Sequence, residues 1–462
     1  MDSAKKGSES SFLQNSSFCS EVFQPPADAK MSLARTAGDS VMMKKMWRAG
    51  PKTIQSLDHD ILCLVFSFLN LFDLARCSVV CKSWNAVIVR YKLLQLLCHK
   101  LQQDSSTYST PSTSQQSLEI DLELFAMKQH RSLLQEGQID IDQWKGHSIR
   151  IDQCRLKMGL VLTGVGDKVW FMIFNASHAY GLPGAVPLVD FDFDESKIVG
   201  LVSNRICIWR RNGKKTIFPS QEGTFSKGLC MRYFDPEAVV GCEDGTACVF
   251  DMYSRKCSRI VRMHAWPLTC LALSEDQIIF SGSALGHITV ADPSSDQLVV
   301  RLKSTESRGG IKTLCFNPSS HFVFAGTTAG YISCWDLRKR GVLWERRASP
   351  NVVYSLQHQR NDTSLLVAGG IDGVLRILNQ STGEVLSSCV MDDKNLQSSS
   401  RNEHVILERK KGRRVLGDFE IDRIPRSARP PITCLAVGMK KVVTTHGGKH
   451  ISVWKFNNTE TG

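Results

Sequence analysis

The stretch Phe324 to Asp336, FAGTTAGYISCWD, decides the fold, because the chain repeats its pattern. In this pattern a glycine between small residues is followed by a turn and then by a β-branched and apolar run. The other clear copies are residues 240–251, 280–292 and 367–378. Their shared glycines, Gly241, Gly282, Gly326 and Gly369, are 41, 44 and 43 residues apart. A period of about 40–45 residues is typical of β-propellers, which build each unit from four short strands.

Weaker copies of the pattern complete the series. Two of them end at Trp209 and Trp454, and the earliest covers Val169–Phe174, so we count seven units. Strands with a period of two, such as the one from Ile311, agree with half-buried sheets. After residue 136 we find no helical pattern of useful length, which a parallel-sheet enzyme would need. We therefore predict a mainly β fold with a seven-bladed propeller over residues 139–456.

The closure of this ring is also predicted by the sequence. The last repeat ends near Phe456 and lacks an outer strand, whereas residues 138–144 alternate just before the first repeat. We expect this segment to supply the missing strand through Ile139 and Ile141. Such a latch would remove an exposed sheet edge.

A different pattern occupies residues 51–97. Apolar residues at helical spacing predict three to four short helices, and Asp58 and Asp60 favour a helix N-terminus at their start. So small a unit cannot bury this much apolar surface alone. Either the helices pack on the next domain as a cap, or one face awaits a partner.

The segment resembles an F-box, which favours the second interpretation. The residues that carry the resemblance are Leu57, Ile61, Phe66, Leu69, Leu74, Val80 and Trp84, together with Leu62, Asp73 and Cys81. Asp58 departs from the pattern, since proline is commoner there. The resemblance implies a small all-α domain in which the first seven residues divide between the helical core and a face that binds an SKP-type adaptor. Through that adaptor the chain would reach a cullin–RING core of an SCF-type ubiquitin ligase.

Residues 139–456 resemble WD40-repeat proteins, although single repeats are degenerate. Trp335-Asp336 is the only intact Trp-Asp pair. In that family an aspartate of the inner turn bonds a histidine from the preceding loop. The resemblance gives this structural role to Asp167, Asp244 and Asp372, whereas other repeats hold Asn204, Leu285, Ala329 or Gly447 at the position. It makes His147 and His264 structural residues.

The remaining segments have simpler patterns. Residues 1–50 are rich in serine and lysine, and we expect disorder. Residues 98–138 predict a helical linker with a Ser-rich loop at 104–117, which is either a rigid coupling or a flexible tether. An insertion at about 391–429 contains the basic run 409–414. This run is either a nuclear import signal, an anion-binding arm or a solvated flexible loop.

Composition narrows the class of protein. No run of eighteen apolar residues exists, and the N-terminus lacks the apolar core of a secretory signal. The 16 cysteines are scattered without a Cys-x-x-Cys pair, so we expect reduced, buried thiols and no metal site. No phosphate loop, zinc helix or nucleophile with its base is present. We therefore expect no cofactor, no catalysis, no membrane partner, and a location in the nucleus or the cytoplasm.

Charge is unevenly distributed along the chain. The first 142 residues hold equal numbers of basic and acidic side chains, so the net charge of +12 lies in the propeller half. A basic propeller suits an acidic or phosphorylated protein ligand. It would equally suit RNA or a membrane surface, but no aromatic–basic interleaving favours RNA. We expect Lys168, Arg205 and Arg262 to reach the binding face, and the opposite face or rim to hold Arg210, Arg211, Lys339 and Arg340.

Taken together, these patterns predict a substrate receptor of an SCF-type ubiquitin ligase. The first alternative is a non-catalytic WD40 scaffold. The second is a receptor of a different cullin ligase, since Trp335-Asp336-Leu337-Arg338 resembles the Trp-Asp-x-Arg motif of such receptors. The missing catalytic site disfavours the third, an enzyme built on a propeller.

Overall fold

The structure is a computed structural model of the chain. It describes residues 54, 57–103, 115–145, 147, 149–166, 168–173, 176–181, 187–210, 213–219, 225–292, 297–304, 309–392 and 407–458. The predicted disorder of residues 1–50, most of the Ser-rich loop, Asp167 and Arg211 lie outside these ranges. The chain divides into two compact units, Met1–Phe125 and Ala126–Gly462.

The first unit is helical. Its helices are α1 (His59–Ser67), α2 (Leu71–Ser78), α3 (Lys82–Arg90), α4 (Leu93–Gln103) and the beginning of α5 (Gln115–Glu136). Asp58 and Asn70 cap α1 and α2, because their side chains accept hydrogen bonds from the amides of His59 and Asp73. A small core of Leu62, Phe66, Leu74, Val87, Ile88 and Leu93 holds the helices together.

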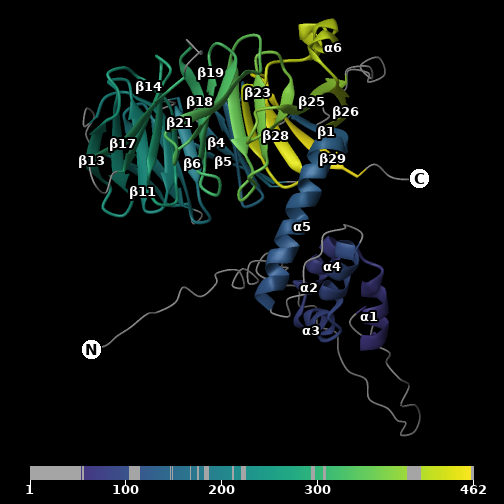
Figure 1. The fold of residues 1–462 in the computed structure, drawn as a ribbon. Coiled ribbons are helices and arrows are strands. Elements are labelled where there is room, and N and C mark those ends of the chain that lie inside the picture. Colours follow the sequence, from purple (N-terminus) through teal and green to yellow (C-terminus); the bar gives the residue numbers. More distant parts are fainter. Residues whose placement is uncertain are drawn as a thin grey trace, which may run out of the picture. The chain divides into compact units, whose positions relative to one another are not determined.

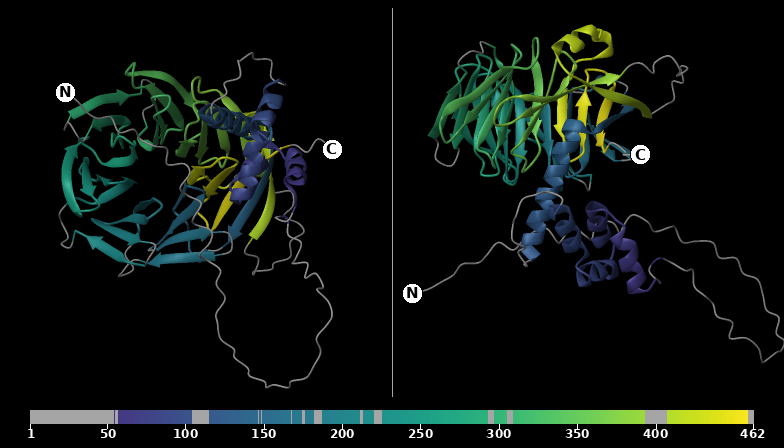
Figure 2. Two further views of the ribbon diagram at one scale, coloured as in Figure 1. Left: turned by 90° about the horizontal axis from the view of Figure 1, so that it is seen from below. Right: turned by 45° about the vertical axis from the view of Figure 1, so that its right-hand side comes forward.

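The second unit is built from antiparallel sheets. Five of them have four strands each, joined in sequence order. The first two sheets are β2 (Gln153–Lys157), β3 (Leu160–Val165), β4 (Lys168–Ile173) and β5 (Ala176–Gly181), then β6 (Asp190–Phe193), β7 (Lys197–Val202), β8 (Arg205–Arg210) and β9 (Lys215–Phe218). The next two are β10 (Gly228–Phe234), β11 (Glu237–Cys242), β12 (Thr246–Asp251) and β13 (Lys256–Arg262), then β14 (Leu268–Leu273), β15 (Ile279–Ser283), β16 (His287–Asp292) and β17 (Gln297–Lys303). The fifth is β18 (Ile311–Asn317), β19 (Phe322–Thr327), β20 (Tyr331–Asp336) and β21 (Gly341–Arg347). The sheets follow one another around a ring (Figure 2).

The remaining strands form one sheet of nine, in the order β22-β23-β24-β25-β26-β1-β29-β28-β27. Their bounds are β22 (Val353–His358), β23 (Leu365–Gly370), β24 (Leu375–Asn379), β25 (Val385–Asp392), β26 (Leu407–Val415), β1 (Gln138–Lys145), β29 (His450–Asn457), β28 (Lys441–Thr445) and β27 (Cys434–Val437). The described part of the chain thus has a propeller-like arrangement with five separate four-stranded sheets, not the seven separate blades that the repeats predict.

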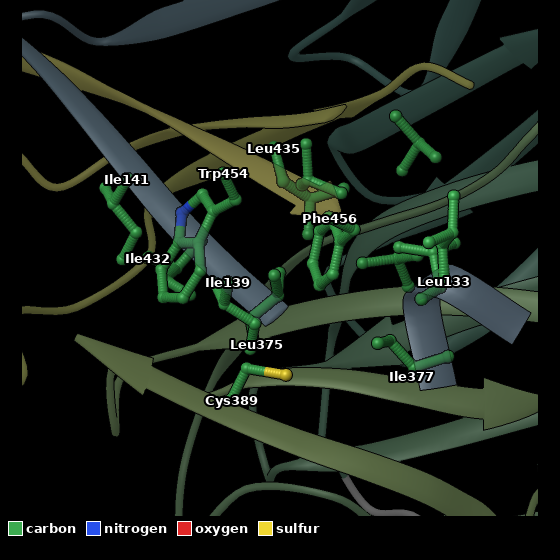
Figure 3. Close-up of a cluster of buried hydrophobic side chains, with 14 of the residues drawn as sticks. Leu133, Ile139, Ile141, Leu375, Ile377, Cys389, Ile432, Leu435, Trp454 and Phe456 are labelled. Atoms are coloured by element: carbon green, nitrogen blue, oxygen red, sulfur yellow. The ribbon is translucent and has the colours of Figure 1, made fainter. Parts of the chain in front are cut away.

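The predicted closure of the ring is confirmed. β1 pairs antiparallel with β29, so that Ile139 lies opposite Phe456 and Ile141 lies opposite Trp454. These side chains enter a buried cluster that also contains Leu133 and residues of β24, β25 and β27 (Figure 3). The C-terminal turn of α5 therefore belongs to the core of the second unit.

Of the interpretations left open for residues 409–414, the flexible loop is wrong. These residues lie in β26, which pairs with β25 on one side and with β1 on the other. After it comes a short helix α6 (Asp418–Arg423), labelled in Figure 1. A single 3₁₀ turn (Arg426–Ala428) follows the helix. Two sheet edges with free amides and carbonyls provide partners on both sides, so a strongly charged segment forms a strand without an apolar face of its own.

Candidate functional site

Helix α1 is apolar on two faces. Leu62 and Phe66 point into the core of the first unit, where the Phe66 ring meets the edge of Trp84 at a centroid distance of 5.2 Å. The other face exposes Ile61, Leu64, Val65 and Phe68, and the Phe68 side chain is 81% exposed. Their spacing of three and four residues places them in one stripe along the helix, which we call the α1 stripe.

The residues predicted for the adaptor face fall into three groups. Leu57, Ile61 and Val80 are exposed, Phe66 and Leu74 are buried, and Leu69 and Trp84 pack half-buried against the core. The buried and half-buried residues thus fix the positions of the helices, and the exposed ones are available for contact. Sequence reasoning missed Leu64 and Phe68, although both continue the α1 stripe at helical spacing from Ile61.

The propeller-like unit offers a second surface. In each four-stranded sheet the chain runs back and forth, so the turn between the second and third strands lies at the same end as the end of the fourth strand. Hydrogen bonds show this arrangement, since the amides of Met263 and His264 after β13 both donate to the carbonyl of Gly245 in the β11–β12 turn. We call this end of each sheet its turn end.

Lys168, Arg205 and Arg262 all lie at turn ends, one on each of three sheets. They pair in the ladders with Val165, Val202 and Thr246, respectively. Lys168 and Arg262 are exposed, whereas Arg205 is half-buried with an unpaired buried Nε. The structure thus places the three cations at the same ends without joining them in one pocket. Arg210 ends β8, and Lys339 and Arg340 follow β20, so all three lie at the opposite ends.

The turn aspartates are held differently from the family pattern. Asp244 accepts hydrogen bonds from the amide and hydroxyl of Thr246. Burial alone would raise the pKa of Asp244, but these hydrogen bonds outweigh it and lower the pKa. Asp372 forms a buried ion pair of 2.6 Å with Arg376. Thr246 and Arg376 thus hold these two turn aspartates.

The histidines instead bond hydroxyl groups inside the sheets. His264 lies 3.0 Å from the Ser281 hydroxyl, and His147 lies 3.3 Å from that of Thr163. Burial lowers the pKa of both imidazoles. Among the described residues no group of three His, Cys, Asp or Glu side chains could hold a metal ion.

Comparisons with known proteins agree with this geometry. Residues 54–96 match the F-box domain, and residues 297–336 match the WD domain, G-beta repeat. An F-box/WD-40 repeat-containing protein of Arabidopsis thaliana is 56% identical over 446 residues, which cover 91% of this chain and 98% of the relative. The chain belongs to the F-box/WD40-repeat family.

More distant similarities of this F-box/WD40-repeat protein concern the propeller. The COMPASS component SWD3 of Saccharomyces cerevisiae is 27% identical over 146 residues, covering 31% of this chain and 45% of the relative. A chain in the crystal structure of a mitotic checkpoint complex superposes with a TM-score of 0.51 at 13% identity, covering 66% of this chain and 87% of that chain. That likeness shows the fold alone.

Two further motifs of this F-box/WD40-repeat protein have defined surroundings. Trp335 is buried, and the Arg338 guanidinium forms two hydrogen bonds of 3.0 Å to the carboxylate of Asp336. The arginine of the Trp-Asp-x-Arg motif is thus already paired with the aspartate of its own turn. In the basic run, Arg409, Lys411 and Arg413 are exposed on one side of β26. None of the helices in the described part of the chain has the length and apolar character that crossing a bilayer requires.

Proposed function

We propose that this protein is the substrate-recognition subunit of an SCF-type ubiquitin ligase. The observation that carries the proposal is the α1 stripe, four large apolar side chains exposed on a helix whose other face already fills the core. An apolar helix face of this kind fits a partner helix better than water. The match of residues 54–96 to the F-box domain indicates an SKP-type adaptor as that partner.

The second unit would hold the protein that is to be modified. Its turn ends carry exposed cations and belong to loops, the segments that most often bind ligands. An acidic or phosphorylated protein segment suits the positive charge of this half of the chain. Catalysis then belongs to other subunits, and this chain contributes proximity. Its buried free thiols suit the reducing conditions of the nucleus or the cytoplasm.

A ring of seven units is part of the same proposal. In support, β22–β25 and the group β27, β28, β29 and β1 have the strand order of the separate sheets, and β26 lies between these two groups. The first strands also contact one another in a closed cycle, β2-β6-β10-β14-β18-β22-β27-β2. With β26 counted as a bridge, the nine-stranded sheet contributes two units to the five separate ones.

The adaptor contact is tested with Ile61→Ala combined with Phe68→Ala. Because both side chains are exposed in the free chain, the double variant should fold normally and lose only the contact with the partner. Burial of two such side chains at an interface contributes roughly 3 kcal/mol, so the dissociation constant for a purified SKP-type adaptor should rise about a hundredfold.

A matched control is Val89→Ala combined with Leu96→Ala, two exposed apolar residues of α3 and α4 outside the α1 stripe. This control should bind the adaptor like the natural chain. Equal binding by both double variants would contradict the proposal. Identification of the co-purifying cullin also separates this proposal from a scaffold, which brings none, and from a receptor of a different cullin ligase.

A further inference from the structure

Two large apolar side chains lie exposed at the turn end of the β14–β17 sheet. Trp266, in the segment that leads into β14, is 54% exposed, and Leu285, in the β15–β16 turn, is 53% exposed. Leu268 and Ser283 pair in the ladder, so the two side chains flank the same end of the β14–β15 pair. Single exposed apolar residues are ordinary, but two at one strand end favour a surface that another molecule covers.

Exposed cations accompany this apolar pair. Lys303 ends β17 opposite His287, and Arg347 ends β21 opposite Tyr331, so both lie at turn ends. The two sheets are neighbours in the ring, since β14 contacts β18 (Figures 1 and 2). Trp266, Leu285, Lys303 and Arg347 together define what we call the β14–β21 rim.

The described carboxylates of the two sheets do not neutralise this rim. Those at the opposite strand ends are Glu275, Asp276, Asp292 and Asp336. Glu345 lies nearer, but it is half-buried and accepts hydrogen bonds from the hydroxyls of Ser304 and Ser333. The rim therefore combines an exposed apolar pair with two exposed cations.

We propose that the β14–β21 rim is a docking surface for an acidic peptide segment that carries a bulky apolar side chain. The apolar side chain would cover Trp266 and Leu285, and flanking carboxylates would pair with Lys303 and Arg347. A nucleic acid fits less well, because a single aromatic ring beside an aliphatic residue provides no stacking series. This inference rests on the proposed function, since it names the class of segment that the receptor would recognise.

The test is selection from a random dodecapeptide display library on the full chain bound to its adaptor. Trp266→Ala with Leu285→Ala should weaken the selected peptides about tenfold or more, and Lys303→Glu with Arg347→Glu should do the same. Matched controls at the opposite strand ends are Met158→Ala with Val385→Ala, and Lys339→Glu with Arg340→Glu. We expect both controls to bind the selected peptides like the natural chain.

The selected sequences should be rich in Asp and Glu around one Leu, Phe or Trp. Failure to enrich any sequence, enrichment of neutral or basic peptides, or unchanged binding by the rim variants would overturn the assignment. Preferential capture of single-stranded oligonucleotides by the rim would overturn it in favour of a nucleic acid. Since adaptor affinity is measured separately on the α1 stripe, failure of the rim and failure of the receptor function are distinguishable.

Discussion

Two neighbouring arginines of β26 have opposite surroundings, although the sequence presents them as one basic run. Arg413 is exposed, whereas the Arg414 guanidinium donates to the carbonyls of Leu133, Leu134 and Gly137 at 2.8–3.3 Å. The last carbonyls of a helix lack partners within the helix. Arg414 therefore caps the C-terminus of α5 and ties it to β26.

This contact predicts different effects for two similar substitutions. Arg414→Met should lower the free energy of unfolding of the second unit by about 2 kcal/mol, because the carbonyls of Leu133, Leu134 and Gly137 lose a charged donor. Arg413→Met removes the same charge from an exposed position and should leave stability unchanged. Urea unfolding of both variants measures the difference. Equal midpoints would show that the cap contributes nothing to stability.

At the same scale, the F-box shows what single residues reveal in a sequence. Spacing predicts that α1 is amphipathic, and Leu62 and Phe66 are indeed buried. It does not separate the core face from the partner face, because both are apolar and together cover most of the helix. Ile61 and Phe66 therefore look alike in the sequence and differ only once α2 and α3 pack on one side.

At the scale of elements, β1 and β26 were not equally predictable. β1 alternates Ile139 and Ile141 with polar residues, so its pattern alone indicates a half-buried strand. β26 is made mostly of charged residues and has no apolar alternation. It forms a strand only because β25 and β1 provide sheet edges on its two sides. Gly412 also permits this pairing, because a Cβ there would lie 2.5 Å from the Ile139 side chain. Tertiary surroundings of this kind leave no local signal.

The pairing of β1 predicts how truncation affects folding. A chain that begins at Ser148 lacks β1, so both β29 and β26 lose a hydrogen-bonded neighbour. We expect it to aggregate or to melt at much lower temperature than a chain that begins at Gln138. Light scattering and thermal unfolding of the two chains measure this. Monomeric behaviour with equal melting temperatures would rule out β1 as a necessary closing strand.

For the whole molecule, the sequence predicts where charge lies along the chain but not where it gathers in space. Repeats at 41, 44 and 43 residues are regular enough to predict a propeller. The nine-stranded sheet, in which β26 pairs with β25 and β1, is not visible in the period. Cations from distant repeats lie at equivalent strand ends because the four-stranded sheets share one meander.

The positive propeller half predicts that target capture depends on charge at the turn ends. Lys168→Glu with Arg262→Glu reverses two charges at exposed turn-end positions. Arg205 is left unchanged, because substitution of a side chain with a buried Nε could also disturb folding. Capture of an isolated target should weaken about tenfold or more, and it should fall further at high salt and after phosphatase treatment if phosphate supplies the negative charge.

Lys339→Glu with Arg340→Glu reverses the same number of charges at the opposite ends and should leave capture intact, which separates local pairing from net charge. If capture by the natural chain ignores both salt and phosphatase, an anionic target is the wrong class, and a neutral or apolar segment takes its place.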